Sequence, residues 1–376
     1  MRKKTSLIHG GKSIDQYTGA LSVPIHPAST FKQDGVGNFT YEYARTGNPT
    51  REAVETLIAD LEKGTRGFAF ASGMAAITAV MMLFKSGDHI IVTDDVYGGT
   101  YRLMTRILDR QKISASFVDT SEPSNLEEAI LPNTKAVLVE TPTNPLLKIT
   151  DLQKVAEITN KNDLLLIVDN TFSTPYWQTP IEQGANIVLH SATKYLGGHS
   201  DLVAGLVVTN DQNLGQEMHF IQNATGGVLS PHDSWLLIRG IRTLGIRMEE
   251  IEKNSNQIAN YLLNHPNVSK VYYPGLIDHP YRNIHSKQSD GFGGMISFVV
   301  ENEEKALDVL DKVRYFTLAE SLGAVESLIS LPAKMTHASI PRDRRLEVGI
   351  ADGLIRISVG LEDVDDLIED LDQALA

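Results

Sequence analysis

The sequence predicts an α/β protein with a large domain built on a mostly parallel, doubly wound, seven-stranded sheet and a smaller C-terminal α/β domain. Two observations predict this fold. Between residues 46 and 240, short apolar runs alternate with helix-like segments, which is typical of parallel strands buried on both faces. Beyond them, one long segment with helical apolar spacing leads into shorter elements with a polar face. We therefore expect a large domain over residues 46–240 and a small domain over residues 241–376.

Residues 1–45 have a different composition from the rest of the chain. They are rich in Gly, Pro, Ser and aromatic residues and show no sustained periodicity, which predicts an extended arm. An arm of this length is expected to pack on a neighbouring subunit. No apolar segment follows the basic start at Arg2–Lys4, so we expect no signal peptide.

Each element of the two domains is expected from its local pattern. The expected strands of the large domain are Gly67–Phe70, His89–Val92, Ser114–Val118, Ala136–Glu140, Leu164–Asp169, Ile187–His190 and Leu206–Val208. The expected helices between them include Met74–Lys85, Thr100–Arg110, Leu152–Thr159 and Ile181–Gly184. Pro231 predicts the start of one long helix, Asp233–Asn264, which links the domains. The small domain is expected to contain βαβ-type pieces built from Gly294–Val300, Glu304–Val313, Leu354–Val359 and Val364–Leu375.

Composition excludes several classes of protein. Apolar residues make up 42% of the 376 residues and charged residues 22%, which is typical of a globular protein. The net charge of −13 disfavours nucleic acid as a partner, because the phosphate backbone is repelled. The absence of cysteine excludes disulfides, zinc–thiolate sites and cysteine nucleophiles. No apolar run reaches the ~18 residues of a membrane helix, and we expect a cytoplasmic protein without a membrane partner.

Two strand ends carry the residues that pyridoxal phosphate (PLP) chemistry needs. The segment His190-Ser191-Ala192-Thr193-Lys194 follows an apolar run and brings an amine and two hydroxyls to one place. A lysine can bind the PLP aldehyde, and hydroxyls can bind its phosphate. Asp169 ends another apolar run, where it can pair with a protonated pyridine nitrogen. Taken singly, the first segment also fits a strand that ends in a turn with a solvated lysine.

Further strand ends carry groups that suit the same cofactor. Gly73 and Met74 open a helix whose backbone N–H groups can approach a phosphate. Tyr97 stands beside two glycines and can lie over a ring, and Asn144 lies in a rigid turn between prolines. A tight turn, a packing tyrosine and plain turn chemistry are the structural alternatives. The chain has no G-x-G-x-x-G motif and no P-loop, so a dinucleotide or nucleoside triphosphate is not indicated.

Over essentially its whole length the chain resembles the Cys/Met-metabolism PLP enzymes of fold type I. The resemblance rests on Tyr43–Arg51, Ser72–Ala76, Tyr97–Thr100, Glu140–Pro145, Val168–Thr171, Ser191–Tyr195, Ala319–Gly323, Met335–Ser339 and Leu354–Gly360. It implies a PLP-dependent transferase-like fold and PLP as the cofactor. It also implies a homotetramer, a dimer of dimers with shared active sites.

The resemblance further implies a role for each candidate residue. Lys194 would hold PLP and move protons between substrate carbons, and Tyr97 would stack on the ring and exchange a proton with the substrate. Asp169 would pair with the ring nitrogen. The phosphate would be bound by Gly73, Met74, Ser191 and Thr193, and by Tyr43 and Arg45 of the neighbouring subunit's arm. Arg356, Ser321 and Asn144 would hold the substrate carboxylate, for which an arginine fork is well suited. Single-residue alternatives are an ordinary strand arginine for Arg356 and a solvated loop arginine for Arg45.

Two positions bear on the reaction within this family. Methionine γ-lyases of the family carry cysteine where this chain has Gly99, which argues against that activity. Glu320 resembles the acid that γ-lyases and γ-synthases place near the distal amino group of cystathionine; its alternative is a solvated loop glutamate. The resemblance is strongest to bacterial cystathionine/homocysteine γ-lyases of reverse transsulfuration. We therefore expect α,γ-elimination of L-cystathionine, with homocysteine desulfhydration, hydrogen sulfide release and some β-elimination as side activities.

Three alternatives stay open. A cystathionine γ-synthase and a cystathionine β-lyase share the same sites. A protein of another class would keep the fold for binding without catalysis, which the joint presence of Lys194, Asp169, Tyr97 and Arg356 opposes. His190, His199 and His232 form no metal-ligand motif, so core or surface roles are expected for them and no metal site.

Overall fold

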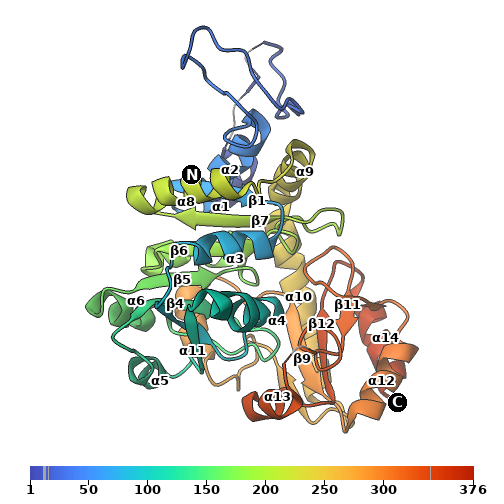
Figure 1. Ribbon diagram of the computed structural model, residues 1–376. Helices are drawn as coiled ribbons and strands as arrows, with labels where there is room; N and C mark the ends of the chain where they lie inside the picture. The colour runs from blue at the N-terminus through green and yellow to red at the C-terminus, as the bar shows by residue number, and fades with distance from the viewer. Residues whose placement is uncertain (12–13, 16, 339) are drawn as a thin grey trace.

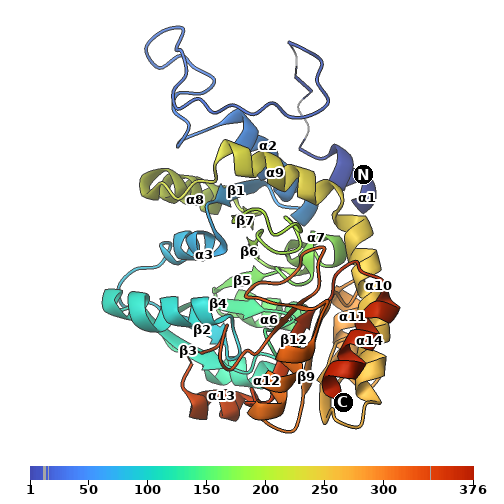
Figure 2. The same ribbon diagram turned by 90° about the vertical axis from the view of Figure 1, so that its right-hand side faces the viewer.

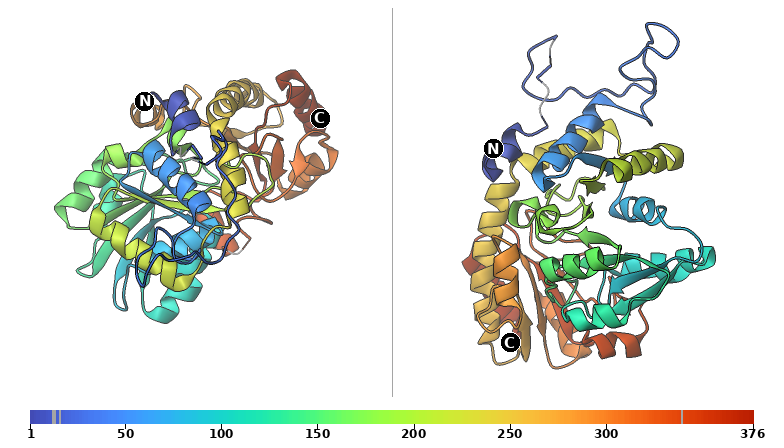
Figure 3. Two further views of the ribbon diagram at one scale, coloured as in Figure 1. Left: turned by 90° about the horizontal axis from the view of Figure 1, so that it is seen from above. Right: turned by 90° about the vertical axis from the view of Figure 1, so that its left-hand side faces the viewer.

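The computed structural model, which describes residues 1–11, 14–15, 17–338 and 340–376, contains two sheets that lie side by side (Figure 1; Figure 3). The seven-stranded sheet has the order β1-β7-β6-β5-β4-β2-β3. Its strands are β1 (Arg66–Phe70), β2 (His89–Thr93), β3 (Ser114–Val118), β4 (Thr134–Glu140), β5 (Leu165–Asp169), β6 (Ile187–Ser191) and β7 (Gly205–Thr209). Only β7 runs antiparallel to its neighbours. All the strands expected for the large domain are present, and the mostly parallel sheet is confirmed.

Helices cover both faces of this sheet, and most residues of its strands other than the edge strand β3 are therefore buried. One apolar cluster contains Ile91 of β2 and side chains of α2 (Pro49–Glu62), α6 (Leu152–Lys161) and α9 (Pro231–Arg242). The other contains Ile90 of the same strand and side chains of α3 (Gly73–Met81) and α8 (Gln212–Thr225). Neighbouring residues of a strand point to opposite faces. The alternation of Ile90 and Ile91 between the clusters therefore shows a doubly wound sheet.

Short helical elements connect the strands of this sheet. They are α4 (Gly98–Arg102), α5 (Pro123–Glu128) and α7 (Thr174–Trp177). The expected helix Thr100–Arg110 is present as α4 followed by a π-helical turn (Leu103–Leu108) and a 3₁₀ turn (Asp109–Gln111). The expected helix Ile181–Gly184 is a 3₁₀ turn, Pro180–Gln183.

Two helices near the N-terminus were not expected from the sequence. Helix α1 (Lys3–His9) lies within the expected arm, and α2 lies just after it, beginning with Asn48 as its cap and Pro49 as its first residue. The Asn48 side chain accepts from two backbone N–H groups of the first turn, a capping signal that was legible in the sequence. Much of the segment 17–45 extends away from the rest of the molecule (Figures 1 and 2), but Val23 is buried in the apolar cluster that contains Ile91. Tyr17 and Leu21 on this segment are 98% and 72% exposed.

The second sheet has five strands in the order β10-β11-β12-β9-β8. They are β8 (Lys270–Tyr272), β9 (Met295–Val299), β10 (Thr317–Leu318), β11 (Leu328–Ser330) and β12 (Leu354–Ser358), with α10 (Leu244–Leu263), α11 (Arg282–Gln288), α12 (Glu303–Lys312), α13 (Arg342–Val348) and α14 (Val364–Leu375) around them. All neighbouring pairs except β10 and β11 are antiparallel. The expected βαβ pattern holds only for β9-α12-β10, whose strands run the same way but are separated by two others.

The expected helix Asp233–Asn264 is two helices, α9 and α10, which run in different directions (Figure 2). The break is at Thr243, with φ −102° and ψ 2°. The Arg247 guanidinium donates to the carbonyl of Gly240 near the end of α9 and to that of Tyr195. The Gly240 carbonyl, near the end of α9, also accepts from the Thr243 N–H and hydroxyl, so Arg247 adds a further donor there and ties it to the Tyr195 carbonyl. Sequence periodicity could not show the break, because it depends on this non-local contact.

Candidate active site

A cavity of about 250 Å³ lies where the carboxyl ends of β4, β5 and β6 meet the N-terminus of α3 and loops of the second sheet. Its lining includes most of the candidate residues: Gly73, Met74, Tyr97, Asn144, Asp169, Ser191, Thr193, Lys194, Glu320, Ser321 and Arg356. Ligands of open α/β sheets bind beyond the carboxyl ends of the strands. The position of the cavity follows from the topology of the sheet.

The N-terminus of α3 forms one end of the cavity. Ser72 caps the helix, its Oγ accepting the Ala75 N–H at 3.0 Å. Gly73 and Met74 are the first helical residues, whose N–H groups have no carbonyl of the preceding turn to bind. Gly73 packs against Ser191 so closely that a Cβ on the glycine would lie 3.0 Å from the Ser191 Oγ. Two backbone donors and two hydroxyls, those of Ser191 and Thr193, therefore line this end of the cavity.

Lys194 is half-buried in the middle of the cavity. Its Nζ donates to the Ser321 Oγ at 2.7 Å. Burial, together with the nearby Arg356 guanidinium, lowers the pKa of Lys194 to about 8. Ser321 has a φ of +126°, which only glycine adopts without strain. Strained backbone of this kind is concentrated at ligand sites, where the surrounding structure enforces it.

Asp169 is fixed by the residue that follows β5. Its Oδ1 accepts from the Thr171 N–H at 3.0 Å and from the Thr171 hydroxyl at 2.5 Å. Both bonds go to Oδ1, so Oδ2 is left for a group in the cavity. Burial raises the pKa of Asp169 above its usual range. A protonated ring nitrogen beside Oδ2 would stabilise the carboxylate.

Arg356 of β12 brings the second sheet into the site. This guanidinium is buried; it donates to the Asn144 Oδ1 at 2.8 Å and to the Ser321 carbonyl at 3.1 Å. Burial lowers the pKa of Arg356 to about 10. His337, to which sequence reasoning gave no role, donates to the Asn144 carbonyl at 2.9 Å. Burial beside Arg356 lowers the pKa of His337 to about 3, so the imidazole is neutral and orients Asn144.

Tyr97 stands at the mouth of the cavity with 37% of its surface exposed. Its backbone N–H donates to the Glu140 Oε2 at 3.0 Å. Its ring fills the space beside Gly99, where a Cβ would lie 2.3 Å from the Tyr97 Cε1 and 2.8 Å from the Met74 Sδ. A side chain at position 99 would therefore force the Tyr97 ring or the Met74 side chain to shift. Glu140 was part of a motif, but its contact with Tyr97 could not be read from the sequence.

Tyr43 and Arg45 are the two candidate residues that do not line this cavity. They lie beside a separate hollow that also includes Arg51. The Arg45 guanidinium donates to the Asn223 side chain at 2.9 Å and lies 5.5 Å from the Tyr43 ring centroid. Their role towards a neighbouring subunit stays a prediction.

The histidines occupy different environments. His190 is buried, with its Nε2 2.6 Å from the Glu62 Oε1. His199 contacts the Gly197 carbonyl, and His232 is exposed beside Asp233. Across the described part of the chain, no three His, Asp or Glu residues are grouped so that they could hold a metal ion. No helix in the same residues is both long and apolar enough to cross a bilayer.

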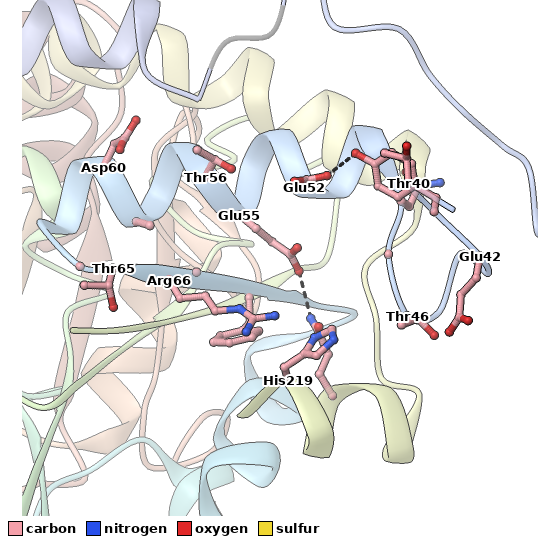
Figure 4. A pocket seen from close by; sticks show the side chains of 18 of the residues that line it. Thr40, Glu42, Thr46, Glu52, Glu55, Thr56, Asp60, Thr65, Arg66 and His219 are labelled. Atoms are coloured by element: carbon pink, nitrogen blue, oxygen red, sulfur yellow. Dashed lines mark hydrogen bonds between the residues drawn. The ribbon is translucent and has the colours of Figure 1, made fainter. Parts of the chain in front are cut away.

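A larger cavity of about 420 Å³ lies elsewhere, between α2, α8 and the segment that precedes α2. Figure 4 shows Glu52 and Glu55 along α2, with Arg66 and His219 on the other side of the space. The Glu55 carboxylate is already bound there, accepting from the Gln222 side chain at 3.0 Å. None of the candidate residues lines this cavity. Size alone is therefore a poor guide to the active site of this protein.

The residues of the smaller cavity fit PLP. The four donors at the α3 end suit a phosphate, the Lys194 amine suits the aldehyde, and the free oxygen of Asp169 suits the ring nitrogen. Fold and site together define a PLP-dependent α/β enzyme of fold type I.

Comparison with known proteins then gives the family. The family model "Cys/Met metabolism PLP-dependent enzyme" matches residues 4–376, and the chain belongs to this family. It is 64% identical to the cystathionine gamma-lyase of Bacillus subtilis over 376 residues, 100% of this chain and 99% of the relative. It is 57% identical to a cystathionine beta-lyase of Lactococcus lactis, covering 99% of this chain and 98% of the relative.

A solved structure extends this likeness to three dimensions. The crystal structure of cystathionine gamma-lyase from Lactobacillus plantarum complexed with L-serine is similar with a TM-score of 0.97 and 53% identity. The match covers 100% of this chain and 98% of that one. The family and the fold inferred from the sequence are both confirmed, and PLP is the cofactor.

Proposed function

We propose that this protein catalyses the α,γ-elimination of L-cystathionine, in which cystathionine and water give L-cysteine, 2-oxobutyrate and ammonia. One observation carries the proposal: the cavity has a buried arginine, Arg356, and a carboxylate, Glu320, around the same lysine. Cystathionine has a carboxylate and an ammonium group at each end, which suits such a pair of anchors. The 64% identity to a cystathionine gamma-lyase supports the same reaction.

Binding begins with the substrate α-carboxylate. The Arg356 fork is already oriented by the Asn144 Oδ1 and the Ser321 carbonyl, so little side-chain freedom is lost when a carboxylate binds. Glu320 is exposed on the cavity wall and is close enough to Lys194 to oppose the lowering of its pKa. A carboxylate there would attract the distal ammonium of a long substrate.

Proton transfer is then the work of Lys194 and Tyr97. When bound, PLP supplies an electron sink conjugated with the substrate α-carbon. With a pKa of about 8, the Lys194 amine can take the α proton and then a β proton near neutral pH. The Tyr97 hydroxyl is proposed to protonate the γ-sulfur as it leaves. Homocysteine desulfhydration with hydrogen sulfide release fits the same sites, because it differs only in the leaving group.

Product analysis tests this proposal. Purified holoenzyme incubated with cystathionine should give cysteine and 2-oxobutyrate as the main products. Homocysteine and pyruvate as the main products would identify a β-lyase, an alternative that the 57% identity to a cystathionine beta-lyase keeps in view. Dominant condensation of cysteine with an O-acylated homoserine would identify a γ-synthase; a relative of that name is 48% identical.

We also propose a cytoplasmic homotetramer in which Tyr43 and Arg45 reach the cofactor phosphate of the neighbouring subunit. The exposed apolar residues of the arm support contact with another subunit, because such side chains are rarely left in water. Sedimentation equilibrium should therefore give about four chains per particle, and a monomer at micromolar concentration would contradict the assembly.

A further inference from the structure

We infer that Glu140, assisted by Thr143, is a positioning residue that sets the place of Tyr97 over the active-site cavity. This inference rests on the proposed role of Tyr97. It concerns a contact that no motif in the sequence identifies, between the end of β4 and the loop after β2.

Glu140 lies next to the reactive groups without pairing to a cation. It is the last residue of β4 and is directly paired in register with Asp169 of β5. The side chain is buried, and it lines the cavity. Its Oε2 accepts the Tyr97 N–H at 3.0 Å, and its own N–H donates to the Thr93 Oγ1 at 3.3 Å. The carboxyl group therefore holds the residue that carries the ring.

The surroundings of Glu140 favour the neutral form of its carboxyl group. Burial raises its pKa well above the usual range, and the nearby carboxylates of Asp169 and Asp95 raise it further. A neutral carboxyl group still accepts the Tyr97 N–H through an oxygen lone pair. In that form it adds no second negative charge beside Asp169, which a protonated ring nitrogen would keep ionised. Glutamine, which is always neutral and has a carbonyl oxygen, is therefore the matched replacement.

A second hydrogen bond connects the segment after β4 with the loop after β2. The Thr143 hydroxyl donates to the Asp95 Oδ2 at 2.6 Å, and both groups are buried. The next residue, Asn144, binds Arg356. One short segment, residues 140–144, thus fixes the Tyr97 loop on one side and the carboxylate-binding arginine on the other. The distance between ring and carboxylate site is set by this segment.

The test compares holoenzyme variants Glu140→Leu, Glu140→Gln, Tyr97→Phe and the double variant Glu140→Leu/Tyr97→Phe. Leucine leaves the Tyr97 N–H without its acceptor, and we expect kcat for cystathionine to fall on the order of 10–100-fold, with a smaller change in KM. Glu140→Gln should stay within about threefold of the parent. In the Tyr97→Phe background, Glu140→Leu should lower kcat by less than about threefold, because the hydroxyl that Glu140 positions is already absent.

Visible circular dichroism of the bound cofactor reports the placement of the ring without catalysis. Glu140→Leu should change the cofactor band, and Glu140→Gln should retain it. If Glu140→Leu lowered kcat by the same factor in the parent and in the Tyr97→Phe variant, the inference would be overturned. An unchanged cofactor band would overturn it as well. If Tyr97→Phe kept full activity, the proposed role of Tyr97 would fail, whereas the band would still decide whether Glu140 places the ring.

Thr143→Val provides an independent variant if Glu140→Leu does not fold. It removes the bond to Asp95 and leaves the Glu140 contact in place. We expect the same change in the cofactor band with a smaller loss of kcat, about threefold to tenfold. A Thr143→Val enzyme with the parent's band and kcat would contradict the inference.

Discussion

Lys194 lies in surroundings that favour its uncharged amine. Burial and Arg356 lower its pKa to about 8, whereas a solvated lysine titrates near 10.4. The protonated form dominates below the folded-state value, so the free amine increases as the pH rises towards 8. At pH 7 the amine is free in roughly a tenth of the molecules, far more than for a solvated lysine.

This pKa predicts the pH dependence of cofactor capture. The rate at which apoprotein binds PLP covalently should rise with pH, reach half its maximum near pH 8 and then level off. Stopped-flow absorbance over pH 6–10 measures it. A rate that keeps rising to pH 10 would mean that Lys194 titrates like a solvated lysine.

The ring of Tyr97 predicts a second effect at the residue scale. In Gly99→Ala the new methyl group would meet the Tyr97 ring at 2.3 Å, so the ring must move. We expect a loss of kcat on the order of 10-fold or more. Gly227→Ala is the matched control, because its Cβ would meet Ala75 at 3.7 Å, an ordinary contact. Comparable losses in both variants would show that the closeness of the ring is not the cause.

At the scale of elements, Arg247 connects the break between α9 and α10 to the turn that carries Lys194. The Arg247 guanidinium binds Gly240 at the end of α9 and the carbonyl of Tyr195, the residue after Lys194. Arg247 is buried, which lowers its pKa to about 10. The turn that carries the lysine is thereby held by the helix that leads into the second sheet.

Removing this guanidinium should destabilise the protein. Arg247→Met leaves the Tyr195 carbonyl without its donor, whereas Gly240 keeps the Thr243 N–H and hydroxyl, so we expect a loss of about 1–3 kcal/mol in the free energy of unfolding. The urea midpoint of the holoenzyme, followed by fluorescence, measures it. Arg239→Met, on the exposed side of α9, should change stability by less than about 0.5 kcal/mol. An Arg247→Met midpoint equal to that of the control would show that the guanidinium is dispensable.

At the scale of the whole molecule, the arm is where the single chain exposes large apolar side chains such as Tyr17 and Leu21. Tyr43 and Arg45 lie outside the cavity that the other candidate residues line. In the proposed assembly each site would then take Lys194 from one subunit and Arg45 from the other.

Subunit mixing tests this arrangement. Lys194→Ala lacks the lysine and Arg45→Ala weakens phosphate binding, so each variant alone should have little activity at limiting PLP. Random mixing should restore about a quarter of the parent's activity, because half of the dimers are hybrids and each hybrid has one complete site. No recovery after co-refolding would place Arg45 outside the neighbouring site.

Much of this molecule could be predicted from local patterns. Strands of a parallel sheet are buried on both faces, so their apolar runs stand out, and polar residues at their carboxyl ends meet at one edge. That reasoning brought Asp169, Ser191, Thr193 and Lys194 together without any structure. It missed α2, although the Asn48–Pro49 cap was legible.

The sequence by itself determined the strands of the seven-stranded sheet, the family and the candidate residues for PLP, because these depend on the order of neighbouring residues along the chain. The tertiary structure alone decided the break at Thr243, the antiparallel second sheet and the contacts of Glu140 and His337. Each of these depends on groups far apart in the sequence, such as Glu140 with Tyr97 or Asn144 with Arg356. Such pairs meet only after the sheets have packed, so a local sequence pattern cannot predict them.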